Sequence, residues 1–245
     1  MEEEIILGEW TNERLDGLLL ASSGISDCGR RVEYLSRQFL GTAYGENTLK
    51  GDSVTPEVFV VNLKEVDCFT FLDYVEAMRR SSSFSGFRES LKRVRYRDAS
   101  VAFSRRNHFF TDWTVYNVGL IRDVTGQIGG GHTVTAMKAL NRRGDGECFI
   151  PGLPVTHRAV TYVPTELLSE EGRGRLQTGD YVGVYSDLEG LDVSHVGIVV
   201  RDGAAPRFRH ASSVLSHRRV IDEDFASYFI GKAGIVVVRP TDSSP

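Results

Sequence analysis

Three side chains that lie far apart in the sequence have the types needed for nucleophilic hydrolysis of an amide. Cys68 stands at the start of an apolar segment, and His195 and His210 lie in two short apolar runs much further along the chain. A cysteine nucleophile needs an adjacent base, and that base needs a third group to orient it. Cys68, His195 and His210 can fill these roles in that order, provided that the fold brings them together.

The segment EVDCFTFLDYVEAMRR, residues 65–80, predicts an amphipathic helix with Cys68 at its beginning. Its core face would hold Phe71, Leu72, Val75 and Met78. At a helix N-terminus the helix dipole favours an anion and raises the thiolate fraction of a cysteine. The alternative is a structural thiol, because free cysteine is among the most buried residue types. The segment alone leaves both interpretations open.

The segment SHVGIVVRDGAAPRFRHASS, residues 194–213, predicts two antiparallel strands with a turn centred on Asp202 and Gly203. In that register His195 lies opposite His210, and directly opposed residues have Cβ atoms roughly 4.5–5.5 Å apart. A bulge, or an early end of pairing at Pro206, would shift the register and turn one imidazole to the other face.

Two alternatives remain open for these histidines. His210 can be an ordinary histidine on the surface of a sheet, in which case another group orients His195. A cysteine and two histidines can also bind zinc, with water as the fourth ligand. A cysteine mechanism would be insensitive to a chelator and abolished by alkylation.

The surrounding pattern favours helices in the first half of the chain and strands in the second. Asp27 is a plausible N-cap for a helix over residues 28–40, with Gly41 as its stop, and another helix is expected near residues 86–94. Residues 57–63 are expected to be extended, and residues 42–52, 81–87 and 142–147 to form loops. Short strands are expected over residues 179–185, 194–200, 207–213 and 233–240. This order predicts an α+β fold in which N-terminal helices pack on a central antiparallel sheet.

Composition narrows the classes of function. The chain has 245 residues, of which 41% are hydrophobic and 25% charged, and its net charge is −4. This charge gives no strong field toward nucleic acid, so the basic segments 88–98 and 104–108 are interpreted as solvated surface and no nucleic-acid partner is expected. No apolar window approaches the roughly 18 residues of a membrane span, and MEEEIILGEW lacks the pattern of a signal peptide. Three cysteines make no disulfide framework.

Several motifs together resemble a known family. GTAY at residues 41–44, DCFTF at 67–71, SHVGIVV at 194–200 and RHASS at 209–213 are similar to the NlpC-type superfamily of bacterial cell-wall cysteine peptidases and amidases. SRRNHFFTDW at 104–113, IGG at 128–130 and GLDVSHVGI at 190–198 more closely resemble its N-acetylmuramoyl-L-alanine amidase-like branch. The resemblance runs from about residue 32 to residue 213.

The resemblance implies a papain-like fold, in which the cysteine opens a helix packed on a small antiparallel sheet. It implies that Cys68, His195 and His210 are catalytic and that Tyr44 lines the site. Cysteine and histidine are further apart here than in compact members of the superfamily, so residues from about 84 to 169 are expected to form an insertion that walls the cleft of a single catalytic domain, residues 1–245. Asn107, His108 and Trp113 are candidates for substrate contacts, with a packed surface turn as the alternative.

The implied function is hydrolysis of the amide between N-acetylmuramic acid and L-alanine in peptidoglycan or muropeptides. One alternative is cleavage of the γ-D-glutamyl bond to the diamino acid, and another is a non-catalytic module that binds muropeptides. No metal or organic cofactor is needed for this mechanism. A monomer is expected, acting in the bacterial cell envelope (periplasmic or exported) or in the cytoplasm. His217 has no evident partner in the sequence and no role is assigned to it.

Overall fold

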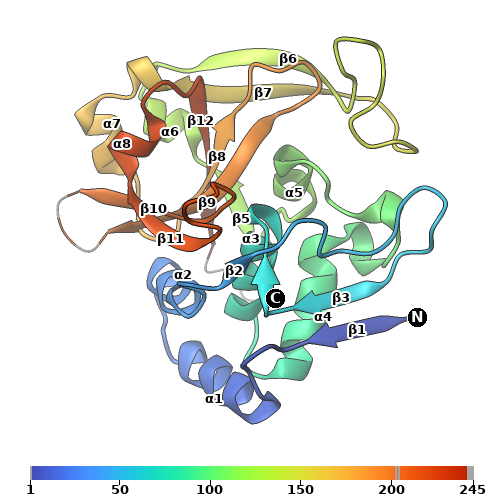
Figure 1. Cartoon of the computed structure of the whole chain (residues 1–245). Coiled ribbons are helices and arrows are strands. Elements are labelled where there is room, and N and C mark those ends of the chain that lie inside the picture. Colours follow the sequence, from blue (N-terminus) through green and yellow to red (C-terminus); the bar gives the residue numbers. More distant parts are fainter. Residues whose placement is uncertain (1, 202, 204, 242–245) are drawn as a thin grey trace. The chain divides into compact units, whose positions relative to one another are not determined.

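The structure is a computed structural model that describes residues 2–201, 203 and 205–241. The chain divides into two compact units (Figure 1). Unit 1 consists of Met1–Arg106 and Arg209–Asp222, and unit 2 of Asn107–Phe208 and Glu223–Pro245. Both units combine helices and strands, which confirms the predicted α+β class.

Unit 1 contains four α-helices and several short strands. Its helices are α1 (Asn12–Ser23), α2 (Cys28–Arg37), α3 (Cys68–Arg79) and α4 (Phe84–Arg95), followed by the 3-10 turns η1 (Arg97–Ala99) and η2 (Phe103–Arg105). Its strands are β1 (Glu3–Ile6), β2 (Ala43–Tyr44), β3 (Phe59–Asn62) and β4 (Glu65–Val66), with parts of β10 (Pro206–Ser212) and β11 (Arg219–Asp224). β1 pairs with β3, and β2 pairs with both β4 and β11.

The helix predicted over residues 65–80 is α3. It starts at Cys68 because Asp67 caps it. The Asp67 carboxylate accepts hydrogen bonds from the backbone N–H groups of Phe69 and Thr70, and the Thr70 hydroxyl accepts one from the Asp67 N–H. The predicted core face is confirmed, since Phe71, Leu72, Val75 and Met78 are all fully buried.

The other predicted helices and the extended segment of unit 1 are present with shifted boundaries, but the segment 42–52, predicted to be a loop, contains the strand β2. α2 begins after Asp27, whose side chain caps it as predicted, but it ends at Arg37, before the predicted stop. Gly41 still takes the left-handed backbone that favours glycine, with φ of 86°. The extended segment is β3. α4 begins at Phe84, inside the segment expected to be a loop, because the Ser83 hydroxyl accepts the Gly86 N–H as an N-cap.

Unit 2 is built on an antiparallel sheet in the order β9-β8-β12-β7-β6, with β5 pairing to β12. Its strands are β5 (Ile121–Asp123), β6 (Val134–Leu140), β7 (Thr156–Pro164), β8 (Tyr181–Tyr185), β9 (Val193–Arg201) and β12 (Gly234–Pro240). Its helices are α5 (Phe110–Tyr116), α6 (Thr125–Gly129), α7 (Glu170–Arg175) and α8 (Phe225–Phe229), with the 3-10 turn η3 (Thr165–Leu167). Buried apolar residues of β8, β9 and β12 form its core with Phe208, Phe225 and Phe229.

The four predicted strands of the second half correspond to β8, β9, β10 and β12. The predicted turn between β9 and β10 falls partly on Asp202 and Ala204, which lie outside the described residues. The register that sets His195 against His210 therefore stays a prediction. β6 and β7 were not predicted. Within the described part of the chain, no helix is both long and apolar enough to cross a membrane.

Candidate active site

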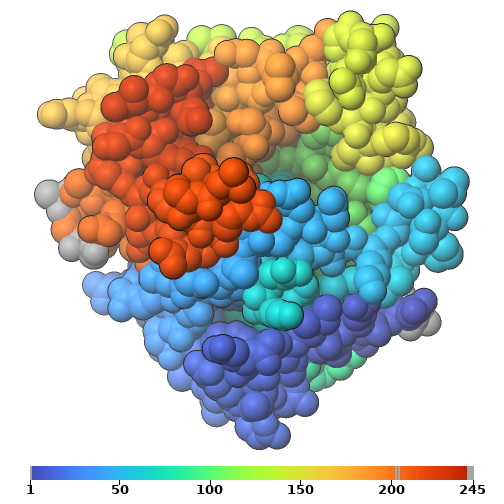
Figure 2. Space-filling view, in the orientation of Figure 1, coloured from blue at the N-terminus to red at the C-terminus, as the bar shows by residue number. Residues whose placement is uncertain are grey.

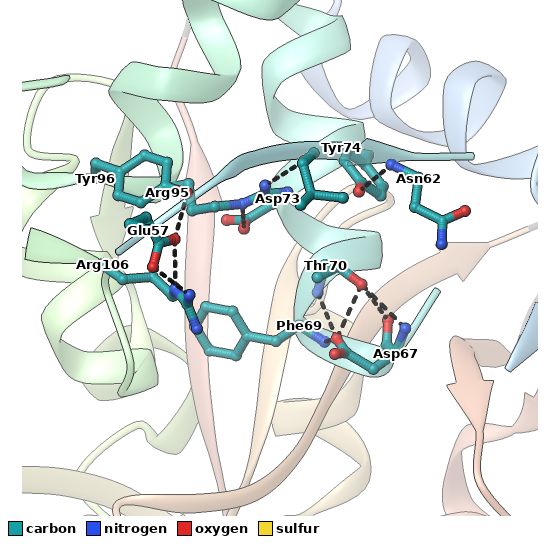
Figure 3. A network of polar contacts seen from close by, with 11 residues as sticks. Glu57, Asn62, Asp67, Phe69, Thr70, Asp73, Tyr74, Arg95, Tyr96 and Arg106 are labelled. Carbon is teal, nitrogen blue, oxygen red and sulfur yellow. Dashed lines mark hydrogen bonds and ion pairs between the residues drawn. The ribbon is translucent and has the colours of Figure 1, made fainter. Parts of the chain in front are cut away.

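Cys68 is a partly exposed thiol on the first residue of α3. The cap that starts the helix also shapes the charge around the thiol. The Asp67 carboxylate takes two N–H groups of the first turn, at 2.9 Å from Phe69 and 2.7 Å from Thr70, and leaves a negative charge next to Cys68 (Figure 3). The helix dipole and the Asp67 carboxylate therefore act on a thiolate at Cys68 in opposite directions.

The rest of α3 is held rigidly. Asp73 forms a buried ion pair with Arg95 of α4 at 2.8 Å, and Arg95 also donates to the backbone carbonyl of Val60 in β3. The Tyr74 hydroxyl accepts the backbone N–H of Asn62 at 2.8 Å. Figure 3 shows these contacts on both sides of the helix. They fix where the N-terminus of α3, and with it the Cys68 thiol, lies within unit 1.

Tyr44 lies beside this N-terminus. β2 pairs in parallel with β4, so that Tyr44 is opposite Val66, two residues before Cys68. Burial raises the pKa of the Tyr44 phenol, and Cys68 and Asp67 raise it further when they carry a negative charge. The phenol therefore keeps its proton at neutral pH. The prediction that Tyr44 lines the site stays a prediction, and its position next to α3 is consistent with it.

His210 lies on β10 and is almost completely buried, with 2% of its surface exposed. Burial is the largest cause that lowers the pKa of its imidazole to about 4, and the neighbouring His217 lowers it further. Asp222 acts in the other direction, but that carboxylate is paired with Arg209 at 2.7 Å. His210 is therefore neutral at pH 7 and able to accept a hydrogen bond.

His195 lies on β9 in unit 2, opposite Val184 of β8. Two aromatic rings flank its imidazole: Phe208 lies edge-on with ring centroids 6.2 Å apart, and Tyr228 of α8 is also 6.2 Å away. The histidine is half-buried. These rings limit the orientations open to the imidazole within unit 2.

Of the candidate substrate contacts, Asn107 and His108 precede α5 and Trp113 lies within it. Asn107 is buried and His108 is half-buried. Trp113 has no exposed surface, because its ring packs edge-on against Tyr181 with centroids 5.3 Å apart. Within unit 2, Trp113 therefore supports the segment rather than presenting a surface. The roles of all three in substrate binding stay predictions.

Asp192 is a residue that the sequence patterns did not single out. Its carboxylate is buried and accepts the Thr111 N–H at 2.7 Å and the Thr111 hydroxyl at 2.8 Å. Burial raises its pKa, and the bonds to Thr111 act against that rise. Asp192 thereby ties the start of the His195 strand to the start of α5. The sequence shows only an aspartate three residues before a candidate base, and its burial and its bonds to Thr111 become visible in the structure.

Three of the predicted site residues, Tyr44, Cys68 and His210, belong to unit 1. The other four, His195, Asn107, His108 and Trp113, belong to unit 2. The meeting of Cys68 with His195 therefore stays a prediction. Among the described residues, no group of three or more His, Cys, Asp or Glu side chains is arranged to hold a metal ion.

Comparison with solved structures finds whole-chain similarity. A protein from Legionella pneumophila is 21% identical, covers 96% of this chain and 95% of its own, and has a TM-score of 0.80. An N-acetylmuramoyl-L-alanine amidase from Bacteroides uniformis is 23% identical over 93% of this chain and 99% of its own, with a TM-score of 0.68. A candidate xylanase from Bacteroides fragilis is 25% identical over 83% and 98%, with a TM-score of 0.67.

Among curated proteins, none matches the chain. The model of the AmiA-like family, described as N-acetylmuramoyl-L-alanine amidase-like, matches residues 34–235. That match covers most of the chain and includes every candidate site residue, from Tyr44 to His210. The chain therefore belongs to the AmiA-like family of N-acetylmuramoyl-L-alanine amidase-like proteins.

Proposed function

We propose that this protein is a cysteine amidase that hydrolyses the bond between N-acetylmuramic acid and L-alanine in peptidoglycan or its fragments. The observation that carries the proposal is Cys68 on the first residue of a rigidly held helix, with the Tyr44 phenol beside it, in a chain of an amidase-like family. Membership of that family supports the choice of bond. We further propose a papain-like, NlpC-type placement, with one catalytic domain whose insertion spans residues of about 84–169.

In the proposed mechanism the Cys68 sulfur attacks the carbonyl carbon of the scissile amide. His195 takes the thiol proton and donates a proton to the amine of L-alanine as the C–N bond breaks, which leaves a thioester between Cys68 and the lactyl group. Water, deprotonated by His195, then cleaves the thioester, releasing the lactyl carboxylate and restoring the thiol. The imidazolium formed at His195 offsets the repulsion between the Asp67 carboxylate and a thiolate at Cys68. The Cys68 backbone N–H stabilises the negative oxygen of the tetrahedral intermediate.

His210 is proposed to orient His195. An orienting group should accept a hydrogen bond from the base without competing for its proton. The lowered pKa of His210, about 4, fits that role, because the imidazole stays neutral wherever His195 works as a base. Mechanistically, His210 resembles the neutral orienting groups of other cysteine hydrolases rather than a second acid or base.

The test uses purified muropeptides and mass spectrometry of the products. We expect the parent protein to release the intact peptide beginning with L-alanine, leaving N-acetylmuramic acid as the sugar product. Cys68→Ala should abolish release, and alkylation should do the same, whereas a chelator should have no effect. Cys148→Ala, at a cysteine outside the proposed site, is the matched control and should retain full activity.

Two outcomes would redirect the proposal. A product that keeps L-Ala-D-Glu on the sugar would indicate γ-D-glutamyl endopeptidase activity instead. A folded parent that binds muropeptides without cleaving them would indicate a non-catalytic binding module. Release by Cys68→Ala at the parent rate would rule out this cysteine as the nucleophile.

A further inference from the structure

Arg218 belongs to unit 1 and contacts Tyr44, at the end of the turn that joins β10 to β11. Its guanidinium lies over the Tyr44 ring, 5.0 Å from the ring centroid. Its backbone carbonyl accepts the Tyr44 N–H at 2.9 Å, and the next residue, Arg219, pairs with Ala43. Arg218 is therefore attached to the strand that lies beside the N-terminus of α3.

The backbone of Arg218 is strained in a way that suggests a use for its side chain. Its φ is 43°, in the left-handed region that glycine adopts without cost and an arginine does not. Strain of this kind persists where the surroundings over-determine the conformation, and it is concentrated at ligand-binding positions. In this conformation the guanidinium of Arg218 lies on the Tyr44 ring.

The charges near Tyr44 make Arg218 important for an anionic ligand. Asp67 and Glu46 both bring negative charge to this phenol, and Arg218 opposes them. An anion approaching Cys68 from the Tyr44 side would be repelled by the two carboxylates if the arginine were absent.

The Arg218 guanidinium forms an exposed ion pair with Glu46, which a ligand can displace. Its Nη1 donates to the Glu46 carboxylate at 3.0 Å, and 40% of the Arg218 side chain and 60% of the Glu46 side chain are exposed. Exposed ion pairs contribute little free energy. A ligand carboxylate that bonds to both arms of the planar guanidinium can therefore replace Glu46. Figure 2 shows that the β10–β11 turn lies at the surface, and Leu215 within it is 89% exposed.

We propose that Arg218 is a substrate-binding residue that recognises the α-carboxylate of the D-glutamyl residue in the peptide released by the amidase. This inference rests on the proposed function, which fixes where the peptide lies. That carboxylate is two residues from the scissile bond, or at most about 7 Å of extended chain. The lactyl carboxyl of the sugar is consumed in the amide, so recognition of an anion at this position falls to the peptide.

The experiment compares two muramyl tripeptides that differ only at D-glutamate, one with a free α-carboxylate and one with that group amidated. We expect the parent protein to hydrolyse the free acid with a kcat/KM about tenfold higher, mostly through KM. Arg218→Gly, which relieves the backbone strain, should fold and lower the ratio of the two kcat/KM values, free acid over amide, to less than about two. Arg218→Lys should keep part of the preference for the free acid. Glu46→Gln should increase the ratio, because the competing carboxylate is removed.

A ratio that is unchanged in Arg218→Gly, or an equal loss on both substrates, would overturn the proposal. The same pair of muropeptides is also titrated by NMR into Cys68→Ala with and without Arg218→Gly. Preferential binding of the acid that depends on Arg218 supports the proposal even if the parent protein cleaves neither compound, and that result would count against the proposed function alone. Equal binding of both compounds with Arg218 present would overturn the assignment of Arg218.

Discussion

The imidazole of His210 is a buried base that folding keeps neutral. Its pKa falls from 6.5 to about 4, chiefly because burial disfavours the charged form. Between these values the unfolded chain binds a proton that the folded protein does not. The free energy of unfolding should therefore decrease as the pH falls from 6.5 to 4, by up to about 3 kcal/mol from this residue alone, and show no such effect above 6.5.

His210→Gln tests this effect, because glutamine keeps a hydrogen-bonding side chain but does not titrate. Urea unfolding of the parent and the variant should be compared at pH 7.5, 5.5 and 4.5. We expect the stability difference between the two proteins to shift in favour of the variant at the lower pH values. Parallel stability curves would show that His210 is accessible to protons in the folded state.

A second prediction at the scale of single residues concerns Asp67. Asp67→Asn keeps the N-cap, since asparagine caps about as well as aspartate, and removes the negative charge beside Cys68. We expect unfolding stability to change by less than about 1 kcal/mol, while alkylation of Cys68 by iodoacetamide at pH 7 becomes faster. Peptide-level mass spectrometry measures the rate, with Cys148 as the internal reference. An unchanged or slower rate at Cys68 would contradict the electrostatic argument.

At the scale of elements, the position of α3 depends on its buried ion pair with α4. Asp73→Ala leaves the Arg95 guanidinium buried without its carboxylate, and breaking such a pair typically costs about 3–5 kcal/mol. The matched control is Glu89→Ala, which breaks the exposed Lys92–Glu89 pair on α4 and should cost less than about 1 kcal/mol. Midpoints of urea unfolding compare the two, and equal losses would contradict the anchoring role.

The elements that could be predicted from sequence were those with a strong local signal. α3 combines an N-cap at Asp67 with an unbroken apolar face, and β8, β9 and β12 are runs of β-branched residues between turns. β6 and β7 were not predicted, because much of each strand is exposed and the polar and apolar residues along it do not alternate cleanly. α4 began earlier than expected because serines that resemble a loop also cap helices.

The residues of the candidate site also differ in whether a sequence pattern marks them. The start of its helix left Cys68 ambiguous, and it was identified through its combination with His195 and His210 and through the family resemblance. Tyr44 was identified from the resemblance alone, and the β2–β4 pairing places it beside α3. Arg218, His217 and Asp192 were not identified, because their importance comes from contacts across the fold. His217 matters because it lies near His210 and helps to lower the pKa of that imidazole, and Arg218 matters because its guanidinium lies on the Tyr44 ring. Neither relation leaves a spacing pattern in the sequence.

At the scale of the whole molecule, net charge bears on which substrate is used. The chain carries 29 basic and 33 acidic residues. Bacterial cell walls are themselves anionic, so a protein with net charge −4 gains no long-range attraction to them. An insertion that walls the cleft, as proposed for residues of about 84–169, would also favour short substrates. On both grounds we propose that the protein prefers soluble muropeptides to intact wall.

This preference can be measured in two ways. At equal concentrations of cleavable bonds, we expect peptide release from soluble muropeptides to be at least about tenfold faster than from intact sacculi. The reason is that encounter with a large anionic polymer receives no electrostatic attraction from a protein of net negative charge. We also expect little of the Cys68→Ala variant, which binds without turnover, to sediment with sacculi at low salt. Raising the salt should not lower the sedimented fraction further, because there is no electrostatic attraction to screen. Strong retention that salt abolishes would instead indicate a localised basic surface that recruits the protein to the wall, with Arg88–Asp98 as the first segment to mutate.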